Sequence, residues 1–407
     1  MLRSLFSGLS GVNIHQTRLD VIGSNLANIN TVAYKESRTT FHDSLYETLQ
    51  GASGTTNPIQ VGTGASVAAI DVLHRQGAIQ PTGEPFDVAI EGSGMFVLSD
   101  GASLLYTRNG SFTVDRNGGL VWSGSGLKVQ GWAATSGVIQ PSGTPGDLAV
   151  PLNTIFPAQA TAEMTLVGNL DANDGVYAAG PPPTGGYRMM SIDVFDSLGI
   201  AHTVDVEFTK TAVDTWAWAA EVAGGSVGTG SVTFDASGAL VPGATPSISI
   251  VLTTGATTPL LVDLDVSEIT QYGGDYTAAV VGQDGFSSGA IEDVSVSSTG
   301  VLTARLSNGQ DVDLGQIALA NFANLRGLSR VANGAFVGSP ASGPPLFGTP
   351  GAGSYGNVTA RALEQSSVDL TRQFVDMIVT QRGFQASARV IATANQILQE
   401  VVNIGGG

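Results

Sequence analysis

Side chains capable of acid–base or metal chemistry are few and scattered in this sequence. The four histidines, His15, His42, His74 and His202, stand far apart on different predicted elements, and cysteine is absent. Thiolate metal sites, cysteine nucleophiles and disulfides are therefore excluded. A zinc site would need histidines and carboxylates to converge, and no segment has the spacing of such ligands. We interpret the histidines as surface residues or hydrogen-bonded core residues.

The acidic and glycine-rich segments do not match reactive patterns either. Two carboxylate pairs, Asp193 with Asp196 and Asp263 with Asp265, lie on predicted strands, where such pairs are common on a solvated face. The segments "LDANDG" and "DVDLG" lack the calcium-loop pattern, and the glycine-rich "GTGAS" and "GTPGAGSYG" lack the phosphate-loop lysine. The sequence predicts no catalytic, cofactor-binding or metal-binding residues, no cofactor and no enzyme activity.

Composition indicates a β-rich, acidic protein. The 407 residues are 42% hydrophobic and 13% charged, with 54 glycines, which fits many short strands and tight turns. The net charge of −17 argues against nucleic acid and anionic membranes as partners. Residues 148–283 hold 14 acids against Arg188 and Lys210, a net charge of −12. The sequence contains no run of 18 apolar residues, so we expect no membrane-spanning segment. No signal-peptide cleavage site follows the start "MLRSLFSGLSGV".

The two ends of the chain are predicted to form long helices. The first 30 residues and the last 40 each place apolar residues at alternating steps of three and four, the pattern of a helix with one apolar seam. We predict that these seams, with four amide side chains, are the self-assembly residues. They are Leu5, Leu9, Val12, Leu19, Ile22, Asn25, Leu26, Asn28, Asn30, Leu370, Phe374, Met377, Phe384, Ile391, Asn395, Leu398 and Val402.

Between the ends, the pattern changes to the period of two that is typical of strands. Pro, Gly and Ser clusters mark the boundaries, and the strands on both sides of the acidic middle are patterned alike. The predicted fold is mixed α and mainly β: long coiled-coil-like terminal helices flank a split β-rich domain with a second β domain inserted in it. The expected segments are an N-terminal axial helix (1–30), an extended linker (31–70), a first half-domain (71–147), an inserted outer domain (148–283), a second half-domain (284–357) and a C-terminal axial helix (358–407).

A turn pattern recurs three times among these strands. In "FTVDRNGGLV", "VTFDASGALV" and "VSVSSTGVLT", an Asp or Ser precedes a glycine by three residues and an apolar residue by five. The Asp or Ser side chain can brace a turn whose glycine takes a positive φ. Each occurrence therefore predicts a hairpin.

The terminal helices cannot bury their seams unaided. About 20 apolar anchors contribute at most about 1.5–3 kcal/mol each, whereas ordering ~70 residues costs on the order of 70–140 kcal/mol in backbone entropy. We expect frayed ends in an isolated chain and ordered helices when copies stack. The amide-rich stretch "DVIGSNLANINTVAYK" (20–35) has two interpretations: Asn and Ser bridge to neighbouring copies and fix register, or Asn25 and Asn28 face solvent near the helix end. Asn28 or Asn30 before Thr31 suits a C-cap.

Both ends resemble signatures of the bacterial flagellar rod, hook and hook-associated proteins. "LDVIGSNLANINTVAYK" contains the N-terminal core, Asn25 to Thr31, followed by Tyr34 and Lys35, and it departs at Ala33, where many relatives have Gly. "ALEQSSVDLTRQFVDMIVTQRGFQASARVIATANQILQEVVNI" (362–404) resembles the C-terminal signature, and "FDSLGIAHTVDVEFTKT" (195–211) resembles the middle region of hook proteins.

The resemblance implies a structural subunit of the hook, a hollow helical tube that acts as a flexible universal joint between rod and filament. It implies a homopolymer that meets the distal rod protein, the hook cap and the hook–filament junction proteins. It also implies passage through a type III export apparatus to an extracellular place on the flagellum, without a cleaved signal peptide. Three alternatives stay open: a distal rod-like axial protein with an insert, a secreted β-rich enzyme acting on cell-wall glycan, and an adhesin.

Overall fold

The computed structural model describes residues 2–51, 57–135, 137–180, 183–243 and 245–405. The chain divides into two compact units, which are described separately. The first unit comprises Met1–Pro151, Val294–Ala304 and Val312–Gly407, and the second comprises Leu152–Asp293 and Arg305–Asp311. The expected boundaries of the inserted domain, 148 and 283, differ from these by four and ten residues.

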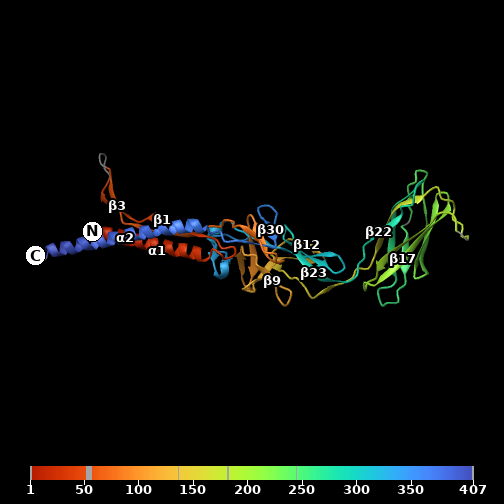
Figure 1. The fold of residues 1–407 in the computed structure, drawn as a ribbon, viewed down its shortest axis with the longest axis horizontal. Coiled ribbons are helices and arrows are strands. Elements are labelled where there is room, and N and C mark those ends of the chain that lie inside the picture. Colours follow the sequence, from red (N-terminus) through yellow and green to blue (C-terminus); the bar gives the residue numbers. More distant parts are fainter. Residues whose placement is uncertain (1, 52–56, 136, 181–182, 244, 406–407) are drawn as a thin grey trace. The chain divides into compact units, whose positions relative to one another are not determined.

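Two long antiparallel helices lie side by side in the first unit (Figure 1). Helix α1 is Leu2–Ala27 and helix α2 is Leu370–Gly405. The segment predicted to begin the C-terminal helix, from 358, instead forms strands β30 (Asn357–Ala360) and β31 (Ala362–Glu364), because their backbones pair with β6 (Val88–Glu91) and β5 (Ile79–Pro81). The helix begins after Asp369, whose side chain accepts a hydrogen bond from the amide of Arg372, as an N-cap does.

The predicted extended linker, 31–70, is largely paired strand. Strand β1 (Ser37–Asp43) pairs with β4 (Ala65–Val72), and β2 (Tyr46–Gln50) pairs with β3 (Ile59–Gly62). The cluster of Gly, Ser and Thr between β2 and β3 falls mostly outside the described residues, and the strands on either side of it pair with each other. Gly64, with φ of +137°, approaches α1 so closely that a Cβ there would lie 2.2 Å from the Ser10 hydroxyl.

The rest of the first unit is a β domain whose core draws on both flanks of the second unit. Met95, Val97 and Tyr106 pack in one cluster with Ala318, Phe322 and Phe336. Its further strands are β7 (Met95–Ser99), β8 (Leu104–Thr107), β9 (Phe112–Val114), β10 (Leu120–Trp122), β11 (Lys128–Thr135), β12 (Val138–Ile139), β13 (Gly146–Asp147), β26 (Leu319–Asn321), β27 (Ser329–Arg330), β28 (Phe336–Val337) and β29 (Leu346–Gly348). Strands β23 (Gly289–Val296), β24 (Val301–Leu306) and β25 (Asp311–Ile317) carry the chain between the units.

The second unit contains two four-stranded sheets around a buried apolar core. One sheet has the order β20-β21-β15-β22 and the other β16-β17-β18-β19. Phe208, Trp216 and Val262 are among the fully buried residues between them. The strands are β14 (Ile155–Phe156), β15 (Glu163–Asp171), β16 (Tyr187–Phe195), β17 (Ala201–Ala212), β18 (Thr215–Val222), β19 (Gly225–Thr233), β20 (Ser247–Ile250), β21 (Leu260–Tyr272) and β22 (Ala279–Gln283).

The three recurring turns are confirmed. Gly118, Gly238 and Gly300 all have positive φ, between +75° and +82°. Asp115 and Asp235 each accept amide hydrogen bonds across their turns, and the hydroxyls of the Ser297 turn do the same at Val301. A hairpin needs both the brace and the glycine, and the sequence supplies both locally, so no tertiary information is required to predict it.

Candidate assembly interface

Small and polar residues make the contact between α1 and α2. A Cβ on Gly8 would lie 2.9 Å from the Ile391 side chain, and one on Gly11 would lie 2.6 Å from the Ser387 hydroxyl. A Cβ on Gly383 would lie 2.5 Å from the His15 ring. The helices therefore approach as closely as they do because these positions lack side chains.

Polar pairs continue this seam toward the β domain. Arg18 donates a hydrogen bond to Asp376 over 2.9 Å, and the side-chain nitrogen of Asn25 donates to the side-chain oxygen of Gln373 over 3.3 Å. Thr380 and Ala394 on α2 are buried at 0% and 5% exposure. The contact positions on α2 thus include 373, 380, 387 and 394, a strict step of seven.

The apolar seams predicted from the sequence lie beside this contact. On α1 the contact uses 8, 11, 15, 18, 22 and 25, whereas most predicted apolar positions, such as Leu9, Val12, Leu19 and Leu26, come one residue later. On α2, the predicted Phe374 likewise comes one residue after the contact position Gln373. One residue turns a helix by about 100°, so these predicted positions lie beside the contact face, whereas the predicted Ile22, Asn25 and Ile391 belong to it.

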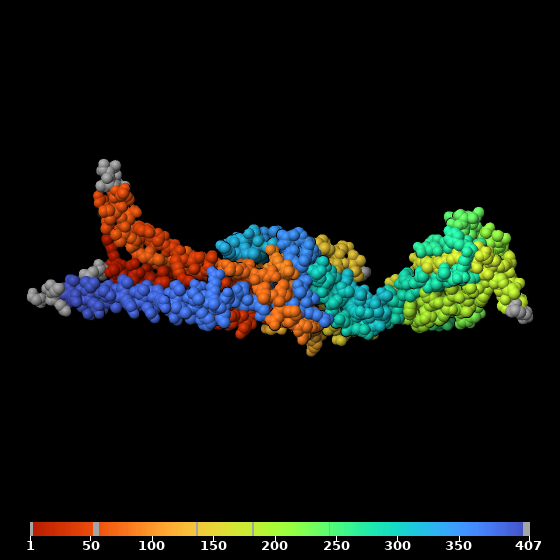
Figure 2. Space-filling model, turned by 45° about the horizontal axis from the view of Figure 1, so that its top comes forward, coloured from red at the N-terminus to blue at the C-terminus, as the bar shows by residue number. Residues whose placement is uncertain are grey.

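Large apolar side chains stay uncovered on α2. Phe374, Val375, Ile378 and Val379 are 46–57% exposed, and Leu9 on α1 is 46% exposed. Figure 2 shows that no other part of the first unit covers the outer side of α2. Several adjacent apolar side chains rimmed by polar ones mark a surface that binds another protein surface.

The predicted assembly residues fall into four groups. Ile22 and Asn25 are buried within the chain. Leu9, Asn30, Leu370, Phe374 and Asn395 are exposed. Leu5, Val12, Leu19, Leu26, Asn28, Met377, Phe384, Ile391 and Leu398 are partly buried. The side chain of Val402 lies outside the described residues.

Asn25 is buried within the chain and does not face solvent. Its side-chain amide donates to the Ser37 carbonyl over 2.8 Å, and its side-chain oxygen accepts from the Ser37 amide over 2.9 Å. It therefore ties the end of α1 to the start of β1, and the interpretation that Asn25 faces solvent is wrong. Asn28 acts as expected at a helix end: its side chain donates to the Ser24 carbonyl over 2.9 Å.

The loop after α1 needs a backbone conformation that alanine disfavours. Ala33 has φ of +56°, and its amide donates to the Glu364 carbonyl. A left-handed conformation is easiest for glycine. The structure therefore gives a physical reason why glycine suits position 33.

A buried ionic cluster, which the sequence did not reveal, lies behind this loop. Lys35 and Glu364 are 2% and 0% exposed and their charged atoms are 2.5 Å apart. Glu364 also accepts from the Gly77 amide over 2.7 Å and lies 3.5 Å from Arg108. Burial lowers the pKa of Lys35, while the charge of Glu364 opposes that shift. The only sequence signal was Lys35 itself, since its partners come from distant segments.

The remaining reactive side chains do not converge. His202 pairs with buried Asp196, and His15 lies in the helix seam. Among the described residues, no group of three or more His, Asp or Glu could hold a metal ion. None of the helices in the described part of the chain is long and apolar enough to cross a membrane.

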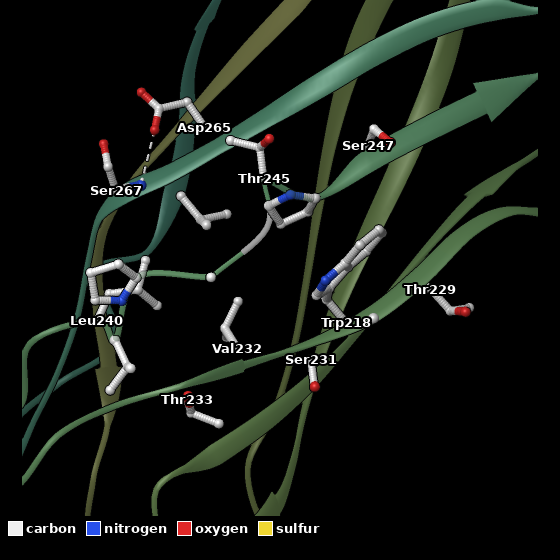
Figure 3. Close-up of a pocket in the computed structure, with 16 residues that line it drawn as sticks. Trp218, Thr229, Ser231, Val232, Thr233, Leu240, Thr245, Ser247, Asp265 and Ser267 are labelled. Carbon is white, nitrogen blue, oxygen red and sulfur yellow. Dashed lines mark hydrogen bonds between the residues drawn. The ribbon is translucent and has the colours of Figure 1, made fainter.

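A hollow in the second unit offers no acid–base pair among its described lining residues. It has a volume of about 670 Å³, and Trp218, Thr229, Ser231 and Ser247 line it (Figure 3). Asp265 is the single carboxylate among the described lining residues, and it accepts from the Ser267 amide. Glycan hydrolysis needs two facing carboxyl groups, which this hollow does not present.

Paired terminal helices that leave large apolar side chains exposed, on a chain otherwise built of β units, are the features of a structural subunit. Four family models match the chain: "Flagella basal body rod protein" at 5–35, "Flagellar hook protein FlgE/F/G D1 domain" at 89–164, "Flagellar basal body protein FlaE D2 domain" at 169–286 and "Flagellar basal body rod FlgEFG protein C-terminal" at 359–404.

Full-length relatives agree with these matches. The chain is 36% identical to the flagellar hook protein FlgE of Borreliella burgdorferi over 99% of this chain and 100% of that protein. It is 34% identical to FlgE of Salmonella typhimurium over 98% of this chain and 100% of that protein. The chain belongs to the flagellar hook protein FlgE family: it is a non-enzymatic structural subunit of the hook, a part of the flagellum.

A solved structure shares the fold. The crystal structure of Helicobacter pylori flagellar hook protein FlgE2 matches with a TM-score of 0.56 at 13% identity, covering 70% of this chain and 100% of that one. At this identity the match speaks to the fold alone.

Proposed function

We propose that copies of this chain assemble through the outer faces of α1 and α2 into a hollow helical tube, the flexible joint between the rod and the filament. The assembly residues of this proposal are those that the sequence predicts on the two terminal helices, except Ile22 and Asn25, which are buried within the chain. In this proposal, the distal rod protein and the hook–filament junction proteins adjoin the two ends of the tube, and a hook cap covers the growing end.

The uncovered apolar face of α2 carries this proposal. Glycines bring α1 and α2 close together, and about half of the surface of Phe374, Val375 and Ile378 stays exposed within one copy. Each side chain of this size contributes roughly 1.5–3 kcal/mol when an assembly buries it fully. The polymer is therefore the state in which these side chains leave water.

A tube needs contacts that do not close on themselves. An interface between two different surfaces of the same chain, repeated by a rotation and a rise, gives an open helical assembly. The two terminal helices offer distinct outer faces, one on α1 with Leu9 and one on α2 with Phe374. We propose that the second unit is the inserted outer domain of the tube, where its acidity keeps it solvated.

An assembly of this kind outside the cell requires export of the chain. We propose that the chain passes unfolded through a type III export apparatus, without a cleaved signal peptide, and assembles outside the cell. The absence of cysteine suits this route, because no disulfide has to form before assembly.

The test replaces an uncovered apolar residue by aspartate. Ile378→Asp is expected to prevent tubes in electron micrographs of seeded protein, while the melting temperature of the monomer stays within about 2 °C of the wild type. Phe384→Asp, in the same helix, is also expected to abolish polymerisation with the β domains folded.

Val213→Asp is the matched control, because Val213 is 74% exposed on a turn of the second unit. It introduces the same charge on an exposed apolar residue outside the helices and should leave tubes intact. Normal tubes from both helix variants would contradict the assignment of the interface.

A further inference from the structure

One pocket of this acidic protein is basic. It lies in the first unit, has a volume of about 580 Å³, and is lined by Arg38, His74, Arg75 and Arg326, with Phe322 and Leu325 among its apolar residues. No carboxylate is among its described lining residues. A site of this composition favours an anionic occupant.

The arginines of this pocket are available. Arg75 and Arg326 have no side-chain hydrogen bond or ion pair within the described residues, and Arg38 lies 3.8 Å from Asp71, a long pairing. Other cations of the chain are engaged, such as Lys128 with Asp147. The chain has 34 acids and 17 Lys and Arg residues, so two unpaired arginines in one pocket are cations that the chain itself leaves free.

Charges behind the pocket strengthen its positive potential. Lys35, Arg108 and Arg330 lie under it, and within the described residues a single buried carboxylate, Glu364, pairs with this group. Their effect is visible on His74: burial first, and then the charges of Lys35 and Arg108, lower its pKa to about 4. The pocket thus gains positive potential from buried residues as well as from its rim.

We propose that this pocket binds carboxylate side chains of a second copy of the chain and forms a charged contact between subunits. This inference rests on the proposed assembly of copies. A neighbouring copy brings many carboxylates to the pocket, since residues 148–283 alone contain 14 acidic residues, of which Asp196 is buried, and assembly holds them at high effective concentration. Such contacts accelerate association and select register more than they add affinity.

Charge reversal with a matched control tests the contact. Arg75→Glu/Arg326→Glu should slow seeded polymerisation at least about tenfold at 50 mM salt, and the difference from wild type should vanish near 1 M, where the screening length falls to about 3 Å. Arg116→Glu/Arg305→Glu changes the net charge equally at two exposed arginines outside the pocket and should slow it far less. Equal slowing of both variants would show an effect of total charge only and overturn the proposal.

A cross-linking variant identifies the partner. The chain has three lysines, at 35, 128 and 210, so Arg75→Lys/Arg326→Lys adds two amines in the pocket. A carbodiimide joins an adjacent amine and carboxylate as an amide and itself takes up the water that is lost. In tubes mixed from ¹⁴N- and ¹⁵N-labelled chains, mass spectrometry should find position 75 or 326 joined to an Asp or Glu of the other isotope.

Further outcomes separate the possibilities. Cross-links confined to one isotope would overturn the proposal. Phosphate binding to the monomer, together with unchanged polymerisation of the charge-reversed variant, would indicate a pocket for small anions and would also overturn it. If the wild type forms no tubes, the proposed function fails. If the wild type and the charge-reversed variant polymerise alike, only this inference fails.

Discussion

The core of the second unit and the junction at the base of the helices hold together in opposite ways. The second unit buries large apolar side chains, such as Phe208 and Trp216, between two sheets. The junction buries Asn25, Lys35, Glu364 and Gln373 and links them by hydrogen bonds. Apolar burial is non-directional, whereas hydrogen bonds require fixed geometry. The comparison indicates that the second unit is built for stability and the junction for setting the direction in which the helices leave the β domain.

Removing a large side chain tests the apolar side of this comparison. Phe208→Ala should lower the free energy of unfolding of the second unit by about 3–5 kcal/mol, because it leaves a cavity in a buried apolar core. Urea unfolding followed by Trp fluorescence measures it. A loss below about 1 kcal/mol would mean that the core collapses around the gap and is not closely packed.

Breaking the buried ion pair tests the polar side. Lys35→Met should cost roughly 3–5 kcal/mol of stability in the first unit, since Glu364 stays buried without its main partner. Adding Glu364→Gln should restore part of the loss, because the new amide oxygen still accepts from the Gly77 amide. Thermal unfolding of both variants gives the comparison, and a double variant less stable than Lys35→Met would argue against an unpaired charge as the cause.

The close approach of the helices can be tested with two glycines. Gly383→Val should destabilise the helix pair by about 1–3 kcal/mol, because a side chain there overlaps the His15 ring. Gly23 has no atom within 4 Å of an added Cβ, so Gly23→Ala should stabilise α1 by about 0.5–1 kcal/mol. Circular dichroism during heating measures the loss of helix in each variant. Equal effects of the two substitutions on stability would show that α1 and α2 do not meet at Gly383.

Acid should weaken the first unit through His74. Its pKa is about 4 in the fold and near 6.5 when unfolded. The unfolded chain therefore binds the proton first, and stability falls as the pH drops from about 6.5 towards 4, by at most about 1.4 kcal/mol per pH unit. His74→Phe should flatten this part of the profile. An unchanged slope in that variant would assign the acid sensitivity to other groups.

Local patterns in the sequence predicted the elements that need few partners. The braced turns at Asp115 and Asp235, the strands of both units and the existence of two terminal helices follow from periodicity and turn chemistry, which act over a few residues. The boundaries were less predictable. Residues 358–369 continue the helical composition but form strands and a loop, because pairing with β5 and β6 outweighs propensity.

The assembly site was predictable only in part. The apolar rhythm located the residues that a helix would bury, and Phe374 and Leu9 are indeed left uncovered within one copy. It did not predict that glycine and serine one position earlier would join the helices, because a contact between small residues becomes visible only when both helices are placed. The role of Asn25 was missed for the same reason, since its partner is a backbone twelve residues away.

By itself, the sequence determined the class of protein: two seamed ends, an acidic β-rich middle, and no set of residues at reactive spacing. The tertiary structure decided which side of each helix is used within the chain and which is left for others, and it brought Lys35, Arg108 and Glu364 into one buried cluster. The physical reason is how far apart in the sequence the interacting residues lie. Helical and strand periods are properties of neighbouring residues, whereas a salt bridge between residues 35 and 364 exists only after the fold has closed.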